Sequence, residues 1–250
     1  MKYVLAILIC FTLLGCNSED GWDCLQTEGN SVSVDFTVDS FDKIRIEDGV
    51  SLLIRQGDIQ SVKIETGSNL LSDIEVYVQD KTLVIRDNNR CNLVRDYGLT
   101  RAVVTTPDLL EIRNASAFDV RGEGRLSFPR LDLVSNTTGN LEDPLKSGDF
   151  YLDLDTERLL VNANGQSVFY LTGRAQRARY RFSDEFPRLE AGELIASEVI
   201  VFQRSANVMI VNPQESLIGE IYGTGDVIAL NRPPIVEVES FFTGRLLFSD

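Results

Sequence analysis

The chain has 250 residues and a formal net charge of −14 at pH 7, because 38 acidic side chains outnumber 24 basic ones. Nucleic-acid binding needs clustered Lys and Arg that release counterions, so this balance argues against a nucleic-acid partner. The sequence has no histidine, which excludes Ser-His-Asp triads, Cys-His nucleophile pairs and His-ligated zinc. Enzymes that work through carboxylates, Lys, Arg or Tyr remain open, and we expect neither a cofactor nor a metal.

The first residues have the pattern of a secretory signal. Residues 1–16 read MKYVLAILICFTLLGC, with a short basic start at Lys2, an apolar run, and Gly15 before Cys16. The apolar run is shorter than the ~20 residues that a membrane-spanning helix needs. Its end, Leu-Leu-Gly-Cys, resembles the lipobox of bacterial lipoproteins. We therefore predict a signal peptide at 1–15 and lipidation of Cys16, with an ordinary signal peptide and an incidental cysteine as the alternative.

The segment 16–30 is predicted to be a lipidated tether. Its first residues after Cys16 are Asn17-Ser18-Glu19-Asp20, and acidic residues at this place resemble the surface-export signal of Bacteroidetes lipoproteins. We expect an outer-membrane lipoprotein that is displayed on the cell surface, with a periplasm-facing location as the alternative. The negative charge opposes adsorption to anionic lipids, so membrane contact should come from the anchor alone.

The cysteines predict one disulfide. Cys10 leaves with the signal peptide and Cys16 carries lipid, which leaves Cys24 and Cys91 in an oxidising compartment. We predict that these two are joined. A two-cysteine metal or redox site is the alternative, although the sequence has no CxxC spacing and no histidine to support it.

From Val32 onward, apolar and polar residues alternate, as in Val32-Ser33-Val34-Asp35-Phe36. Alternation predicts half-buried strands, and the continuous run Leu83-Val84-Ile85 predicts a more buried one. No long window has apolar residues at helical spacing. We therefore predict one all-β domain over 31–250.

The second half carries a repeated turn of the form Thr-Gly-polar-aliphatic, at residues 138–141, 224–227 and 243–246, with a variant at 205–208. Val208, Val227 and Leu246 follow one another at steps of 19 residues, close to one coil of a β-solenoid. Phe-Pro-Arg-Leu also occurs twice, at 128–131 and 186–189, and we interpret the spacing as about three coils. The repeat favours a β-helix or solenoid-like fold over a β-sandwich, but it leaves the register between 141 and 199 open.

Two groups of charged residues are candidate sites. Asp153 and Asp155 share one strand face and could serve a glycosidase or a calcium site, although a solvated face opposite Leu152 and Leu154 is the simpler interpretation. Arg177, Arg179 and Arg181 alternate with apolar residues. They could bind an anionic glycan, or they could form an ordinary solvated strand face.

Aromatic residues recur along the predicted coils and are expected mainly to fill the core, although exposed rings could hold sugars. Phe241 and Phe242 are adjacent, so one of the two should be exposed if they lie in a regular strand. The recurring residues are Phe118, Phe169, Tyr170, Tyr180, Phe182, Phe202, Tyr222, Phe241, Phe242 and Phe248.

A family resemblance runs from about Asp23 to the C terminus. It is carried by the order and spacing of seven blocks, DCLQTEG at 23–29, FDKI at 41–44, LIRQG at 53–57, NLL at 69–71, LVI at 83–85, CNLVR at 91–95 and VVTTPDL at 103–109. Together they resemble the head-GIN domain lipoproteins of Bacteroidetes, described as auto-transporter adhesins. The turn after Ile112, Asn114-Ala115-Ser116-Ala117, departs from the Ser/Gly-rich turn expected there.

The resemblance implies a right-handed β-helix-like fold, an envelope or surface location, and a binding role without established catalytic residues. We therefore expect a lipid-anchored, non-enzymatic, adhesin-like module with a polysaccharide or surface protein as its ligand. The alternatives are a carbohydrate-active β-helix enzyme that uses carboxylates, and a structural envelope protein.

Overall fold

The computed structural model describes residues 23–89, 91–139, 141 and 144–249. Within these ranges the chain is all-β, as predicted: it forms a 17-stranded sheet and two short 3-10 helices, η1 (Asp23–Leu25) and η2 (Leu71–Asp73). None of the helices in these ranges is long and apolar enough to cross a membrane. The predicted signal peptide, the lipidation site Cys16 and the acidic residues after it lie outside the described residues.

The strands of the N-terminal half are short and those of the second half are long. They are β1 (Ser31–Phe36), β2 (Lys43–Asp48), β3 (Val50–Gln56), β4 (Ser61–Gly67), β5 (Ile74–Gln79), β6 (Thr82–Asp87), β7 (Thr100–Thr106), β8 (Glu111–Ser116), β9 (Val120–Leu126), β10 (Arg130–Ser135), β11 (Phe150–Ala163), β12 (Val168–Phe182), β13 (Arg188–Gln203), β14 (Met209–Ile221), β15 (Val227–Ala229), β16 (Ile235–Ser240) and β17 (Leu246–Phe248).

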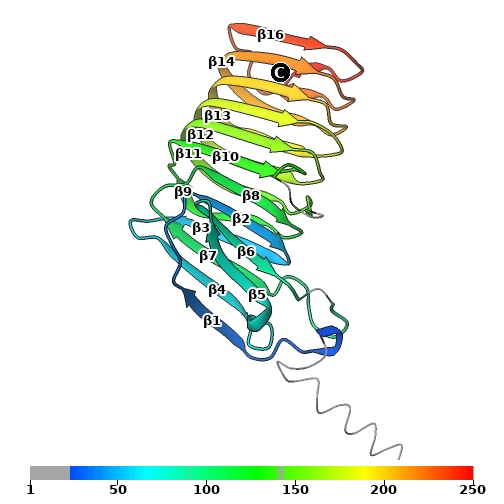
Figure 1. Ribbon diagram of the computed structural model, residues 1–250. Coiled ribbons are helices and arrows are strands. Elements are labelled where there is room, and N and C mark those ends of the chain that lie inside the picture. Colours follow the sequence, from blue (N-terminus) through cyan, green and yellow to red (C-terminus); the bar gives the residue numbers. More distant parts are fainter. Residues whose placement is uncertain (1–22, 90, 140, 142–143, 250) are drawn as a thin grey trace, which may run out of the picture.

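Parallel pairing arranges most of these strands into two walls. Wall A consists of β6, β2, β8, β10, the C-terminal parts of β11 to β14, and β16, in that order. Wall B consists of β7, β3, β9, the N-terminal parts of β11 to β14, β15 and β17. Each of the long strands β11 to β14 therefore contributes to both walls. Figure 1 shows that β2 and β3 are inserted among later strands of the N-terminal half, and that the strands from β10 onward are stacked in chain order toward the red C-terminal end.

The core lies between the walls because alternate residues of each strand point inward. In β12, for example, the buried residues are Phe169, Leu171, Ala175, Ala178, Tyr180 and Phe182, while the residues between them are partly or fully exposed. The ladders place equivalent residues above one another, with Phe150 opposite Phe169 in β11 and β12. Their rings stack at a centroid distance of 4.6 Å.

The ladders fix the register that the sequence left open, and they correct two of its details. Val227 lies opposite Leu246, as the 19-residue step predicts, but its other partner is Met209 and not Val208. The two Phe-Pro-Arg-Leu segments are not equivalent, because Leu131 lies on wall A opposite Leu159, whereas Leu189 lies on wall B opposite Phe169. Their common sequence therefore does not mark a repeat of the fold.

The two ends of the stack differ. At the N-terminal end the pairing becomes antiparallel, between β1 and β4, β4 and β7, and β5 and β6. A disulfide joins Cys24 to Cys91 there, as predicted, with a Cα–Cα distance of 4.5 Å. The C-terminal end carries β16 on wall A and β17 on wall B, far from the first described residues (Figure 1).

Candidate functional site

An open groove of about 870 Å³ crosses the outer face of wall A from β11 to β16. It is lined by side chains that stand above one another in two columns. One column contains Leu160, Arg179, Ile200, Ile218 and Glu237, and the other contains Asn162, Arg181, Phe202, Glu220 and Glu239. The parallel register produces these columns, because every second residue of a wall A strand points outward at the same height as its partner.

The charges of the wall A groove change sign along its length. Arg179 and Arg181 lie on β12, and Glu237 and Glu239 lie on β16. The strands between these two ends contribute the apolar side chains Ile200, Phe202 and Ile218, and β14 adds a further acidic residue, Glu220. The Arg181 guanidinium lies 4.8 Å from the ring centroid of Phe202, within cation–π range.

The structure brings together two of the three arginines that the sequence singled out. Arg179 and Arg181 line the wall A groove. Arg177 is exposed as well, but it is not part of the lining and forms an ion pair with Glu198 at 2.6 Å. Sequence reasoning found the basic face, but it missed the apolar and acidic parts of the groove, because those come from four other strands.

Most of the recurring aromatic residues do not lie in the core, so this expectation was wrong in large part. Only Phe169, Tyr180 and Phe182 of the ten are buried. Phe248 is partly buried and packs against the core. Outward-facing rings stack along the ladders, with Tyr151 on Tyr170 at 4.7 Å and Tyr222 on Phe241 at 4.6 Å.

Phe241 and Phe242 are both exposed, whereas one exposed ring was expected for a regular strand. Both side chains are more than half exposed, at 52% and 59%. The alternation rule does not apply to them, because β16 ends at Ser240 and the two residues lie in the turn that follows.

The paired aspartates do not form a shared site. Asp153 faces outward and forms an ion pair with Arg125 at 3.2 Å. Asp155 instead lines a separate hollow of about 460 Å³, together with Glu157 and Arg174. Among the described residues, no group of three or more acidic or cysteine side chains is placed to hold a metal ion.

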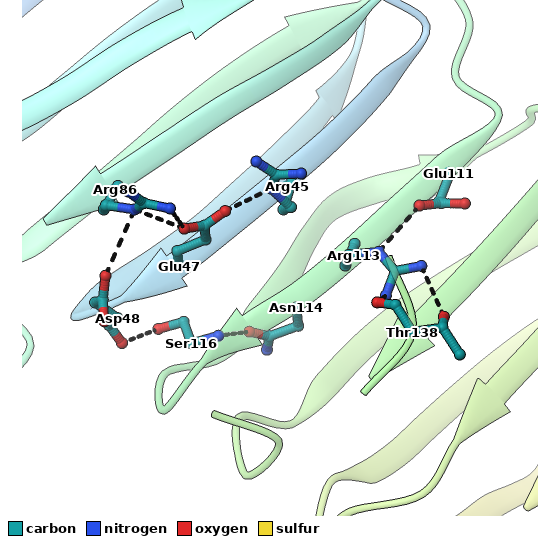
Figure 2. A network of polar contacts seen from close by, with 9 residues as sticks. All are labelled: Arg45, Glu47, Asp48, Arg86, Glu111, Arg113, Asn114, Ser116 and Thr138. Carbon is teal, nitrogen blue, oxygen red and sulfur yellow. Dashed lines mark hydrogen bonds and ion pairs between the residues drawn. The ribbon is translucent and has the colours of Figure 1, made fainter. Parts of the chain in front are cut away.

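A polar network on wall A was not predicted from the sequence (Figure 2). Glu47 is nearly buried, with 8% of its side chain exposed, and it forms ion pairs with Arg45 at 2.5 Å and with Arg86. The Arg86 Nε donates a hydrogen bond of 2.6 Å to Glu47, and this bond is the main reason that the pKa of Arg86 is raised. Arg45 lies on the same strand as Glu47, and Arg86 lies on the neighbouring strand β6. The pairing therefore depends on the register between β2 and β6.

The segment 114–117, which departs from the family pattern, is not a turn but the end of β8 and the corner after it, and it has a structural role in this network. The Asn114 side chain accepts a hydrogen bond from the Ser116 amide and donates one to the Phe118 carbonyl. The Ser116 hydroxyl donates to the carbonyl of Asp48 in the neighbouring strand at 2.7 Å (Figure 2). Asp48 itself has a left-handed backbone, with φ of 56°. The side-chain hydrogen bonds of Asn114 and Ser116 therefore stabilise this tight corner.

The comparisons with known proteins agree with this architecture. The family model described as "Putative auto-transporter adhesin, head GIN domain" matches residues 40–233. The chain belongs to this family. This membership confirms the resemblance seen in the sequence and is consistent with a binding module. A comparison with curated proteins finds no significant match.

Several solved structures share the fold. A putative adhesin from Bacteroides fragilis is 22% identical, with a TM-score of 0.79 and coverage of 89% of this chain and 99% of that one. A putative adhesin and a putative lipid binding protein from Parabacteroides distasonis are 14% and 15% identical, with TM-scores of 0.64 and 0.65. Each covers 89% of this chain, with 99% and 98% of its own length matched.

Proposed function

We propose that this protein is a lipid-anchored, non-enzymatic envelope or cell-surface module that binds a polysaccharide in the wall A groove. The wall A groove carries the proposal, because it is open, crosses several strands and combines guanidinium groups with apolar side chains. Such a groove suits an extended polymer better than a small molecule, which proteins usually enclose in a pocket. Family membership supports a binding role.

We infer that the two walls are formed by successive coils of a right-handed β-solenoid. Parallel ladders with steps near 19 residues support this interpretation, as in the pairs Phe150–Phe169 and Val227–Leu246. Antiparallel strands, of which a β-sandwich is built, pair only at the N-terminal end of the described chain.

The chemistry of the wall A groove favours an acidic polysaccharide. Arg179 and Arg181 offer planar donors that match carboxylate or sulfate groups. The exposed part of Phe202 and the neighbouring Ile200 offer apolar surface for the C–H groups of a sugar ring. The acidic end of the groove, at Glu237 and Glu239, would repel the same polymer. We therefore expect the bound chain to lie over β11 to β13.

Isothermal titration of the full-length protein in detergent with polygalacturonate tests this function. Removing two charge-assisted contacts in the variant Arg179→Gln/Arg181→Gln should weaken binding by at least about tenfold. The control is Arg101→Gln, an exposed arginine on wall B, which should bind like the wild type. A neutral dextran should bind more weakly. Equal binding by all variants, or no binding of polygalacturonate, would overturn the proposal.

One neighbour is named a lipid binding protein, so vesicles of phosphatidylglycerol belong in the same experiment. We expect no groove-dependent binding to them. Vesicle binding that is lost in Arg179→Gln/Arg181→Gln would replace the polysaccharide with a lipid headgroup as the ligand.

The anchor is tested separately. Cys16→Ser should release the protein from membranes and abolish labelling by a palmitate analogue. Unchanged labelling and unchanged membrane fractionation would contradict the lipoprotein part of the proposal.

A further inference from the structure

The C-terminal end of the stack is an open edge. Within the described residues, β16 is paired with β14 and β17 with β15, and no later strand continues either ladder. We call the outer sides of β16 and β17 the C-terminal edge. Exposed strand edges present unpaired N–H and C=O groups, which form a template for another strand.

The backbone groups of β16 can be assigned to its two sides. The Phe241 amide donates to the Ile221 carbonyl of β14 at 2.8 Å. Because successive residues of a strand direct their N–H groups to opposite sides, the amides of Val236, Val238 and Ser240 point to the free side. These three residues can therefore bond to an added strand without disturbing β14.

Apolar side chains of the C-terminal edge that stand on core ladders remain partly exposed. Val236 stands on the same ladder as Val199 and Leu217, which are fully buried, but 36% of Val236 is exposed. Terminal coils of repeat proteins normally need a polar outer face for solubility. The remaining apolar residues exposed near this end are Ile235, Phe241, Phe242 and Leu247.

An aromatic stack also stops at this end. The rings of Tyr222 and Phe241 stack at 4.6 Å with an interplanar angle of 7°, and Phe241 is the last ring of the series. One face of the Tyr222 ring is covered by Phe241, whereas Phe241 remains 52% exposed. A side chain of an added strand could continue the stack.

The charges of β16 indicate which kind of added strand would fit the C-terminal edge. Three outward pairs on neighbouring strands of the stack combine opposite charges: Arg55 with Glu123 at 2.7 Å, Arg125 with Asp153 at 3.2 Å and Arg177 with Glu198 at 2.6 Å. The last strand of wall A presents Glu237 and Glu239 outward. The β14–β16 ladder already places Glu220 opposite Glu239, so Lys or Arg on the next strand would offset this accumulation of negative charge.

A second copy of the chain would not offset the negative charge of β16. If two copies paired through their own β16 strands, Glu237 and Glu239 of one copy would lie beside the same residues of the other. Like charges on directly opposed residues are destabilising. The charge pattern therefore favours a partner of different sequence.

We propose that the C-terminal edge is a strand-addition site for an extended segment of a partner protein in which apolar residues alternate with Lys or Arg. The main chain of the segment would bond to the free amides of Val236, Val238 and Ser240, and its basic side chains would pair with Glu237 and Glu239. This site is separate from polysaccharide binding at Arg179 and Arg181, and it lies at the opposite end of the stack from the first described residues (Figure 1).

Fluorescence anisotropy with two labelled peptides tests the site on the full-length protein in detergent. One peptide alternates Val with Lys, and the other alternates Val with Glu. We expect the wild type to prefer the Val-Lys peptide by about fivefold or more, given two opposite-charge pairs. The charge-reversed variant Glu237→Lys/Glu239→Lys should invert this preference.

The variant Val238→Pro removes one edge amide without removing a bond to β14, and proline is tolerated at such edge positions. It should weaken both kinds of peptide binding, while circular dichroism remains that of the wild type. If Val238→Pro does not fold, the charge-reversed variant alone decides the test, because both of its substitutions are outward-facing. Arg179→Gln/Arg181→Gln should bind the peptide normally, which separates this site from the polysaccharide groove.

Three results would overturn the proposal. The first is no binding of the Val-Lys peptide by the wild type, and the second is equal binding of both peptides by the wild type and the charge-reversed variant. The third is a wild-type dimer in sedimentation that Val238→Pro dissociates, which would make a second copy the occupant of the edge.

Discussion

The polar residues of wall A show how the strand register determines how much a charged side chain contributes to stability. Glu47 is nearly buried, and its carboxylate is stabilised by two guanidinium groups that reach it from β2 and β6. By contrast, Arg55 and Glu123 form their ion pair with about half of each side chain exposed, at 42% and 54%. Exposed pairs contribute little, whereas removing one partner of a buried pair leaves charge without compensation.

Glu47→Gln should therefore lower the free energy of unfolding by about 2 kcal/mol, less than for a fully buried pair because Arg45 and Arg86 can still reach water. The matched control Glu123→Gln should change it by no more than about 0.5 kcal/mol. Urea unfolding followed by circular dichroism measures both. Equal effects of the two substitutions would contradict the role given to Glu47.

The titration of Asp149 should affect the free energy of unfolding. Burial raises the pKa of its carboxyl, and the nearby charge of Asp119 raises it further, although hydrogen bonds from the Val168 amide and the Tyr151 hydroxyl oppose these effects. Between the ordinary pKa and the raised one, the folded protein binds more protons than the unfolded chain. Stability is therefore lost as the pH rises through this interval.

Asp149→Asn should remove this loss, since an amide oxygen can still accept the hydrogen bond from Val168. The variant should be at least as stable as the wild type at about pH 7, and its advantage should shrink or reverse at about pH 3, where the wild-type carboxyl is protonated. Urea midpoints at the two pH values measure the effect. A variant that is uniformly less stable at both would show that the carboxylate is needed for its hydrogen bonds.

At the scale of the element, the repeated Thr-Gly turn correctly predicted equivalent positions in the fold, whereas the repeated Phe-Pro-Arg-Leu segment did not. A Cβ atom on Gly225 would lie 1.9 Å from the Asn207 carbonyl oxygen, and one on Gly244 would lie 2.5 Å from the Gly225 carbonyl oxygen. The turns at 224–227 and 243–246 therefore stack backbone on backbone, which demands glycine at these two positions, whereas the variant turn at 205–208 has Ala206 in this place. Phe-Pro-Arg-Leu only requires that a strand begin after a proline, and that condition is met on both walls.

Gly225→Ala should destabilise the protein by about 2 kcal/mol, because the added methyl group meets a backbone carbonyl that cannot rotate away. Gly49→Ala is the matched control, since the nearest atom to its Cβ would be 3.6 Å away. Thermal unfolding should show a lower midpoint for Gly225→Ala only. A normal midpoint for Gly225→Ala would mean that the spacing between the stacked turns adjusts easily.

At the scale of the whole molecule, the sequence predicted what local patterns can encode. Alternation from Val32 onward identified an all-β chain, and the cysteine count identified the disulfide. The wall A groove could not be predicted in the same way. Arg181, Phe202 and Glu220 are about 20 residues apart in sequence and meet only because bulges in β13 and β14 shift the register. A shift of one residue would have moved each side chain to the opposite face.

The two ends of the molecule differ in structure, and the disulfide lies at the N-terminal end. Cys24 and Cys91 are 67 residues apart in sequence, and their bond fastens the segment before β1 to the segment after β6. Closing a loop of this length restricts the unfolded chain, which should stabilise the fold by about 4 kcal/mol in the loop-entropy model.

Cys24→Ser/Cys91→Ser should therefore lower the urea midpoint by an amount that corresponds to about 2–4 kcal/mol. Binding of polygalacturonate in the wall A groove should be unchanged, because the groove is formed by β11 to β16 at the other end of the stack. Adding reductant to the wild type should reproduce the loss of stability, and the variant should not respond to it. Loss of groove binding in the folded variant would mean that the two ends are coupled through the stack, in contrast to repeat proteins, whose units contact only their neighbours.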